Sequence, residues 1–279
     1  MKKISRRSFL AAAGLSVAAL ALTACGGSSA STASSVASSA ASSEAASTSA
    51  AAGELTTVEA GKLTMATNAT FPPYEMTTDA GEFEGIDIEA AQAIADKLGL
   101  ELQIDDMDFD AALLSVQQGK ADIVMAGVTV TDERKAVMDF SDSYATGIQS
   151  IIVPEGSDIT SPDDLAGKKI GTQRGTTGYI YCSDDFGDDA VVAYDDGLTA
   201  VQALNNGQVD AVVIDNAPAQ EFVAANPGLV ILDTSYAEED YAIGLAKGSA
   251  LEDAVNAALE ELKADGTLQS IVDKYITAE

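Results

Sequence analysis

The sequence predicts an α/β fold whose body is divided between two lobes. Short apolar runs typical of buried strands, such as Ile123 to Ala126, alternate along the chain with amphipathic segments that end at glycine. About 225 residues follow a low-complexity N-terminal region, and a body of that size suits two modest domains better than one.

A faint internal repeat also favours two lobes. The segments L-L-S-V-Q-Q-G-K-A-D-I-V-M-A-G and A-V-Q-A-L-N-N-G-Q-V-D-A-V-V-I-D share a helix, a glycine, an aspartate and a buried strand. The matched pairs are Gly119 with Gly207, Asp122 with Asp210, and Gly127 with Asp215. Each lobe would then present the carboxyl end of a strand to a common crevice, although a tandem array of βα units would leave the same pattern.

The order of elements follows from the same periodicities and from capping residues. Strands are expected at 63–67, 100–104, 123–126, 147–153, 169–172, 191–194, 210–214, 229–232 and 241–246. Helices are expected at 87–99, 108–119, 161–165 and 249–264, with a last helix that ends near residue 275. Asp87 and Ser161 are the expected N-caps, and Ser249 is expected to form a capping box with Glu252.

The composition excludes several classes of function. The formal net charge is −29, which disfavours nucleic acid or an anionic bilayer as a partner. Histidine is absent, so a Ser-His or Cys-His nucleophile is excluded, whereas a carboxylate acid/base pair is not. The acidic run Asp105 to Asp110 resembles part of a calcium-binding loop, but Ala111 and Gln117 stand where that loop requires glycine and glutamate. We expect no metal and no cofactor.

The N-terminus predicts a secreted lipoprotein. Residues 1–24 combine a basic start with an apolar stretch too short to span a membrane, and S-R-R-S-F-L fits either twin-arginine export or the general secretory route. The L-T-A-C segment resembles a lipobox, which implies lipidation of Cys25 and leaves Cys182 without a disulfide partner. Residues 25–60 are rich in alanine and serine and are expected to form a flexible tether.

The stretch from Asp122 to Tyr144 predicts an anion site. A buried strand ends near Gly127, Thr131 is suited to cap a helix, and Arg134 lies on the first turn of that helix. A strand end, a helix N-terminus and a guanidinium could together bind a small carboxylate. The other interpretation is an ordinary capped helix with a solvated arginine.

The segment A-G-V-T-V-T-D-E-R-K-x-x-x-D-F-S-D-x-Y resembles a signature of the extracellular solute-binding proteins, family 3. T-N-A-T-F-P-P-Y-E, F-E-G-I-D-I-E-A-A, M-D-F-D-A-A-L-L, Q-R-G-T-T-G and A-V-V-I-D-N match the family in order, so the resemblance covers about 61–275. It implies a two-lobed, periplasmic-binding-protein-like (type II) fold with two crossover hinge strands. Lobe 1 would comprise 61–145 and 244–279, and lobe 2 would comprise 146–243.

The resemblance implies a binding site for an amino acid zwitterion. Arg134 matches the arginine that binds the ligand carboxylate, with the Thr129 amide and Thr177 completing its hydrogen bonds. Asp215 matches the aspartate that binds the ammonium, together with the Gly127 carbonyl and the Thr129 hydroxyl. Asp215 could instead, or in addition, cap the helix that follows it.

Four further positions would meet the ligand side chain. Phe71 and Phe109 match aromatic residues that enclose the ligand stem, although core packing explains such residues equally well. Asn68 stands where the family often has an acid, and Gln173 stands at another ligand-contacting position. Both amides favour a neutral polar ligand such as glutamine. Glu75 or Asp110 could still serve a basic one.

The expected function is that of the substrate-binding component of an ABC importer, which captures a polar amino acid and delivers it to a permease with its ATPase. We expect a non-enzymatic monomer, anchored by lipid to the outer face of the cytoplasmic membrane of a Gram-positive bacterium. Two alternatives stay open. Some dehydratases and peptidoglycan lyases resemble this family, and a surface lipoprotein could sense amino acids without importing them.

Overall fold

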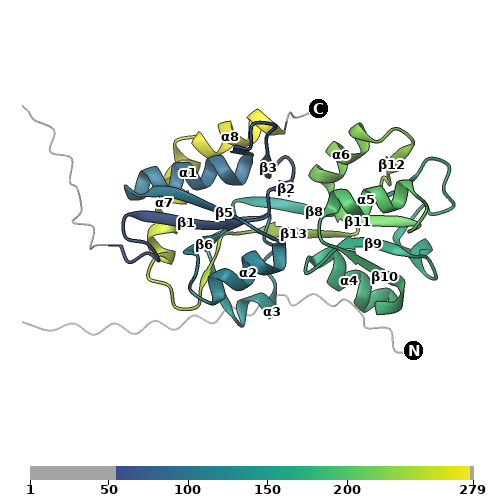
Figure 1. Ribbon diagram of the computed structural model, residues 1–279, viewed down its shortest axis with the longest axis horizontal. Coiled ribbons are helices and arrows are strands. Elements are labelled where there is room, and N and C mark those ends of the chain that lie inside the picture. Colours follow the sequence, from purple (N-terminus) through teal and green to yellow (C-terminus); the bar gives the residue numbers. More distant parts are fainter. Residues whose placement is uncertain (1–54, 277–279) are drawn as a thin grey trace, which may run out of the picture. The chain divides into compact units, whose positions relative to one another are not determined.

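The computed structural model describes residues 55–276. The predicted signal peptide, Cys25 and nearly all of the predicted tether lie outside these residues. No helix in the described part of the chain is long and apolar enough to cross a membrane. Two β-sheets, each flanked by helices, make up most of this part (Figure 1).

The first sheet has the order β5-β1-β6-β14-β7. Its strands are β1 (Lys62–Thr67), β5 (Glu101–Asp106), β6 (Ile123–Val124), β7 (Met138–Phe140) and β14 (Gly244–Ala246). β1 pairs in parallel with β5 and β6, whereas β14 is antiparallel to β6 and β7. The sequence-distant strand β14 therefore completes the sheet that the N-terminal strands begin.

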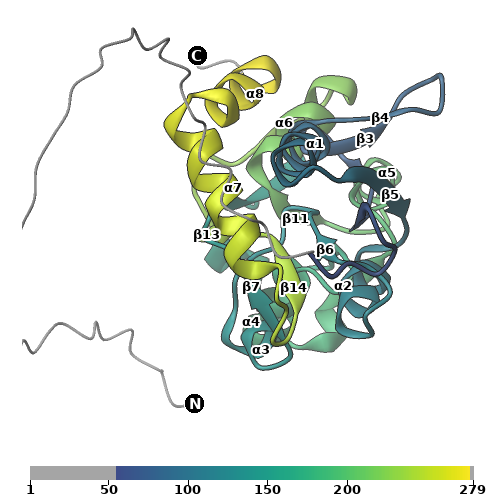
Figure 2. The ribbon, with the colours of Figure 1, turned by 90° about the vertical axis from the view of Figure 1, so that its left-hand side faces the viewer.

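Helices cover both faces of this sheet because its strands are apolar on both sides. α1 (Ile86–Leu98) packs against α7 (Glu252–Ala264) and α8 (Thr267–Tyr275), as Figure 2 shows. Leu63 and Met65 share a core with α1, while Ala66 on the other face packs with α2 (Phe109–Gln117).

The second sheet has the order β10-β9-β11-β8-β12, and β13 pairs with β8 beside this path. Its strands are β8 (Ala145–Pro154), β9 (Ile170–Gln173), β10 (Val191–Tyr194), β11 (Ala211–Asp215), β12 (Leu229–Ile231) and β13 (Ala237–Tyr241). Its helices are α4 (Thr177–Phe186), α5 (Gly197–Asn205) and α6 (Asn216–Ala225), with short 3-10 turns at Pro162–Leu165 and Asp188–Ala190.

Two antiparallel strands join the sheets. The chain enters the second sheet along β8 and returns along β13, and residues 145–149 pair with residues 237–241 (Figure 1). The predicted α/β fold with two crossover strands is confirmed. The expected strand at 241–246 is interrupted, because β13 ends at Tyr241 in one sheet and β14 begins at Gly244 in the other.

The internal repeat has a structural counterpart in each sheet. The carboxylate of Asp122 accepts the Thr64 N–H at 2.8 Å, and the Asp122 N–H donates to the Thr64 carbonyl. Asp210 and Lys169 make the same pair of bonds, with the carboxylate 2.7 Å from the Lys169 nitrogen. Each aspartate thus ties the start of its strand to the neighbouring strand.

Two predicted helix caps are wrong. Gly85 is the N-cap of α1, and Asp87 lies inside the first turn, where its fully buried carboxylate accepts the N–H of Gly127 at 3.0 Å. Ser249 and Glu252 form no capping box, because α7 begins after Leu251 without a side-chain cap. Asp87 is therefore available to tertiary contacts rather than to its own helix.

Two small elements complete the frame of the site. The strands β2 (Thr70–Phe71), β3 (Glu75–Thr77) and β4 (Phe83–Glu84) form a three-stranded sheet, and α3 (Asp132–Lys135) is a single turn. The Thr131 hydroxyl caps α3 as predicted, accepting the N–H of Arg134 at 3.1 Å.

Candidate ligand-binding site

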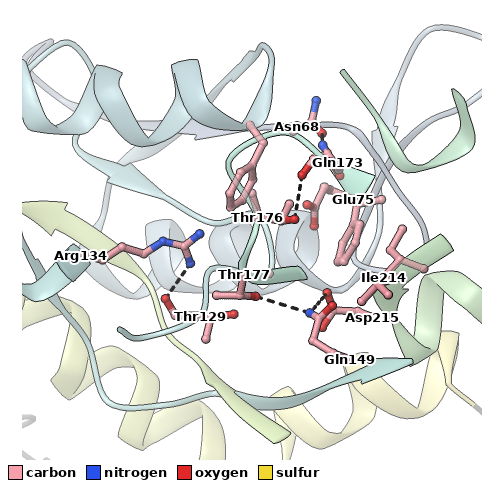
Figure 3. Close-up of a pocket in the computed structure, with 15 residues that line it drawn as sticks. Asn68, Glu75, Thr129, Arg134, Gln149, Gln173, Thr176, Thr177, Ile214 and Asp215 are labelled. Carbon is pink, nitrogen blue, oxygen red and sulfur yellow. Dashed lines mark hydrogen bonds between the residues drawn. The ribbon is translucent and has the colours of Figure 1, made fainter. Parts of the chain in front are cut away.

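One pocket is lined by strands of the second sheet and by segments that follow strands of the first (Figure 3). All nine ligand-contacting residues expected from the sequence line it, namely Asn68, Phe71, Phe109, Gly127, Thr129, Arg134, Gln173, Thr177 and Asp215. Six more residues complete the lining, namely Glu75, Ala126, Gln149, Thr176, Val213 and Ile214. Asn68 and Asp215, almost 150 residues apart in the sequence, thus line the same pocket, because strands of both sheets end there.

Arg134 supplies the positive charge of the pocket. Its side chain is only 8% exposed and lies over the ring of Phe109, 5.4 Å from the ring centre. The guanidinium donates to the carbonyls of Thr129 at 2.8 Å and Gly175 at 3.1 Å. No carboxylate of the described residues forms an ion pair with it. Burial lowers the pKa of Arg134, although a guanidinium stays charged at any working pH.

The solvated-arginine interpretation is therefore wrong. A buried guanidinium that is held only by neutral carbonyls keeps much of its unbalanced charge. An anion that reached its remaining N–H groups would gain a charge-assisted and geometrically directed interaction.

The first turn of α4 reinforces this end of the pocket. The Thr176 hydroxyl caps the helix by accepting the Tyr179 N–H at 3.3 Å. The N–H groups of Thr177 and Gly178 meet no acceptor among the described residues. Because the first N–H groups of a helix favour an anion, they complement Arg134 at this end of the pocket.

Asp215, at the end of β11, supplies a negative charge. Its carboxylate is 8% exposed and accepts hydrogen bonds from the Gln149 amide at 2.8 Å and from the Tyr241 hydroxyl. Burial, with Glu239 nearby, raises the pKa of Asp215 to about 7. Asp215 is the N-cap residue of α6, as the alternative interpretation expected, but its side chain makes no capping bond to that helix.

Glu239 is a buried acid that sequence reasoning missed. One of its oxygens accepts from the hydroxyls of Thr129 at 3.1 Å and Thr177 at 3.0 Å, and from the Gln149 amide at 3.0 Å. Since both hydroxyl hydrogens point to Glu239, both hydroxyl oxygens are left as acceptors. Thr129 can therefore accept from an ammonium, whereas Thr177 can serve a carboxylate only through its backbone N–H.

The two aromatic residues belong to the apolar core and also line the pocket. Phe71 and Phe109 are buried and belong to separate apolar clusters, yet each also lines the pocket. Phe71 stacks on Tyr74 with 5.8 Å between ring centres. Core packing thus fixes the orientation of the rings that face the pocket.

The two amides at the far end of the pocket are joined by a hydrogen bond. The Gln173 amide donates to the Asn68 oxygen at 2.8 Å, and the Asn68 amide donates to the Met107 carbonyl at 2.9 Å. Of the two acids considered for a basic ligand, Glu75 lines the pocket, whereas Asp110 is exposed and does not.

Two open α/β sheets joined by two strands, with a buried polar pocket shared between them, define the two-lobed class of binding proteins. The chain belongs to the bacterial extracellular solute-binding proteins, family 3, whose family model matches residues 63–278. Membership places the protein outside the cytoplasm, in a family of solute-binding proteins rather than enzymes.

Known members resemble the chain over most of its length. The L-cystine-binding protein TcyJ of Escherichia coli is 34% identical over 226 residues, which cover 79% of this chain and 85% of that protein. The arginine-, lysine-, histidine-binding protein ArtJ of Geobacillus stearothermophilus superposes with a TM-score of 0.75 at 34% identity, covering 78% of this chain and 96% of that one. An ancestral arginine-binding protein bound to glutamine has the same TM-score at 42% identity, with coverages of 78% and 99%.

Proposed function

We propose that the protein is the substrate-binding component of an ABC importer and captures a polar L-amino acid in this pocket. The observation that carries the proposal is the separation of charge. Arg134 has no carboxylate partner among the described residues, and Asp215 has no cationic one. A zwitterion supplies the missing partner to both, and relatives named for cystine, arginine and glutamine binding agree with such a ligand.

Each end of the zwitterion has its own set of partners. The carboxylate pairs with Arg134 and with the N–H groups at the start of α4, including that of Thr177. The ammonium pairs with Asp215, the Thr129 hydroxyl oxygen and the Gly127 carbonyl. Phe71 and Phe109 enclose the ligand stem. Asn68 and Gln173 lie beyond it.

Ligand capture would close the two lobes about β8 and β13. The lobes are 61–145 with 244–279, and 146–243. Arg134 and Thr129 belong to the first lobe, whereas Thr177 and Asp215 belong to the second, so a bound zwitterion favours the state in which both sets are close.

The protein binds its ligand without transforming it. Cys182, a conceivable nucleophile, is buried in an apolar cluster away from the pocket lining, and burial raises the pKa of its thiol to about 12. A thiol held in its neutral form is unreactive.

The protein works at the membrane surface. Lipidation of Cys25 anchors it to the outer face of the cytoplasmic membrane of a Gram-positive bacterium, and the segment between Cys25 and the folded body tethers the body. As a monomer it delivers the ligand to a permease that is driven by an ATPase. Both of these partners are membrane-associated and neither is a nucleic acid.

The test is a ligand screen on the purified protein without its signal peptide. Thermal unfolding with each of the common L-amino acids should reveal stabilisation by one polar member or a few, and calorimetry should then give 1:1 binding. Incubation with the best ligand, followed by mass spectrometry, should return it unchanged. Stabilisation by no amino acid would refute the proposed ligand class, and turnover would refute the proposed absence of catalysis.

A further inference from the structure

Tyr241 lies behind the pocket wall, at the end of the crossover strand β13. It is 0% exposed and is not among the residues that line the pocket. Its hydroxyl donates to Oδ1 of Asp215, and the Gln149 amide donates to Oδ2 at 2.8 Å. Each carboxylate oxygen of Asp215 therefore has one donor from these two side chains and keeps lone-pair capacity for a ligand.

The backbone of Tyr241 is paired with the loop that carries the Thr129 hydroxyl. Tyr241 forms an isolated antiparallel bridge with Thr129, and the Ala242 N–H donates to the Val128 carbonyl at 3.0 Å. The Tyr241 carbonyl also accepts the Tyr144 N–H at 3.0 Å. One residue thus joins the loop that follows β6, through its backbone, to the end of β11, through its side chain.

Close packing leaves the Tyr241 ring little freedom to move. The ring lies against Gly147 of the other crossover strand, where an added Cβ atom would be 2.4 Å from it. It packs edge-on against Tyr74 with 5.4 Å between ring centres, and an added Cβ at Gly127 would lie 3.3 Å from it. These contacts on several sides fix where the hydroxyl oxygen lies.

We propose that Tyr241 is a positioning residue for the ligand ammonium, holding the Asp215 carboxylate so that it and the acceptors of the Thr129 loop converge on one point. The inference deepens the proposed function and rests on it. An ammonium has three N–H donors, and its acceptors here follow β6 in one sheet and end β11 in the other. Fixing Asp215 to β13 prepares this set of acceptors before the ligand arrives, which reduces the ordering that binding requires.

The Tyr241 hydroxyl also favours the ionised form of Asp215. Burial raises the pKa of Asp215 to about 7, and the hydrogen bond from Tyr241 opposes that rise. The other titratable or charged groups that act on Asp215 are Glu239 on β13, Tyr74 and Glu75 at the start of β3, and Arg134 on α3. Loss of the hydroxyl would leave all of these in place, so the pKa of Asp215 should rise further.

Tyr241→Phe is the direct test, because it removes the hydroxyl and keeps the ring. The common L-amino acids are titrated calorimetrically into the unaltered protein, and the tightest binder is then measured in both proteins from about pH 6 to about pH 8.5. Ammonium capture needs ionised Asp215, so the affinity should rise as the pH passes the pKa of Asp215. We expect Tyr241→Phe to bind about tenfold to a hundredfold more weakly at pH 7 and to reach its plateau affinity at a higher pH.

Tyr236→Phe is the matched control. Its hydroxyl also donates to an aspartate, Asp185, at 2.6 Å, but neither residue lines the pocket. This variant should change neither the affinity nor its dependence on pH.

Gly147→Ala reaches the same hydroxyl by another route, since its Cβ would displace the Tyr241 ring. It should shift the pH dependence of the affinity as Tyr241→Phe does, and the double variant should shift it no further. Thermal unfolding without ligand shows which variants fold, and Gly147→Ala carries the test if Tyr241→Phe does not.

The outcomes separate this inference from the proposed function. A pH dependence like that of the unaltered protein, or a loss of affinity no larger than in Tyr236→Phe, would overturn the role of Tyr241 and leave amino acid binding intact. Failure of every common L-amino acid to bind the unaltered protein would overturn the proposed function together with it.

Discussion

The hydroxyl of Tyr241 donates a hydrogen bond to the carboxylate of Asp215, which connects a crossover strand directly to the acidic end of the pocket. Tyr241 is fully buried, and Glu239, two residues earlier, lies on the same face of β13. Successive side chains of a strand point to opposite faces, so residues two positions apart share a face. β13 thus connects the loop that follows β6 with the start of α4, since Glu239 accepts hydrogen bonds from the hydroxyls of both Thr129 and Thr177.

Glu239→Gln should weaken amino acid binding by about tenfold to a hundredfold, the range of a hydrogen bond to a charged group. Without the anionic acceptor, the hydroxyls of Thr129 and Thr177 can turn their hydrogens toward the bound ammonium. Calorimetry with the best-binding amino acid measures the loss. Glu238→Gln makes the same change at an exposed position of the same strand and should leave binding unaltered. Equal affinities in the two variants would show that Glu239 does not orient these hydroxyls.

Arg134→Lys should abolish high-affinity binding and leave the stability of the ligand-free protein nearly unchanged. Lysine keeps the charge but loses the planar fork that can reach a carboxylate while also donating to two carbonyls. Arg174→Lys is the matched control, because Arg174 lies largely exposed beside Asp195. Affinities that are alike in the two variants would mean that Arg134 is not the carboxylate-binding residue.

Asp215→Asn should be comparably severe, because it removes the partner of a buried ammonium. Leaving one buried charge unpaired costs about 3–5 kcal/mol, which is roughly two to four decades in affinity. Calorimetry gives the affinity, and thermal unfolding without ligand shows whether the fold survives. Near-wild-type affinity would exclude Asp215 from the site.

The stability of the ligand-free protein should fall as the pH rises from about 5 to about 7.5. Burial raises the pKa values of Glu75, Asp87 and Asp215, so the native state keeps protons that the unfolded state has already lost. The stability that these protons contribute is complete below the ordinary carboxyl pKa values and is lost as the pH passes the native values, about 6 for Asp87 and about 7 for Asp215.

Urea unfolding at several pH values measures this dependence. The double variant Glu75→Gln with Asp215→Asn retains the acidic surface of the protein, so its shallower slope isolates the buried acids. A slope equal to that of the wild type would assign the whole effect to surface charge.

Cys25→Ser should release the protein into the medium, because lipidation requires the thiol. Fractionation of cells that produce either form, followed by immunoblotting, gives the distribution. Ser34→Ala is a control outside the L-T-A-C segment and should stay with the membrane. A processed Cys25→Ser protein that remained membrane-bound would contradict the lipid anchor.

The sequence by itself determined the local architecture of this protein. The cap at Thr131 depends on neighbours in sequence, and the structure has it where it was predicted. The repeated plan at Asp122 and Asp210 also recurs in the structure, although their carboxylates bond to Thr64 and Lys169, which lie 58 and 41 residues away. The resemblance to a family added the nine residues that prove to line one pocket.

Only the tertiary structure decided which carboxyl groups are buried and which residues they bond to. Asp87 was expected to cap its helix, but its partners Gly127 and Tyr144 lie 40 and 57 residues further along the chain. Glu239 sits beside Glu238 and Asp240 in an acidic run, and nothing in that run shows that Glu239 accepts a hydrogen bond from Thr177, 62 residues away. Periodicity and caps are encoded by near neighbours. The burial and partners of a carboxylate, and so its charge, depend on which distant strands are brought against it.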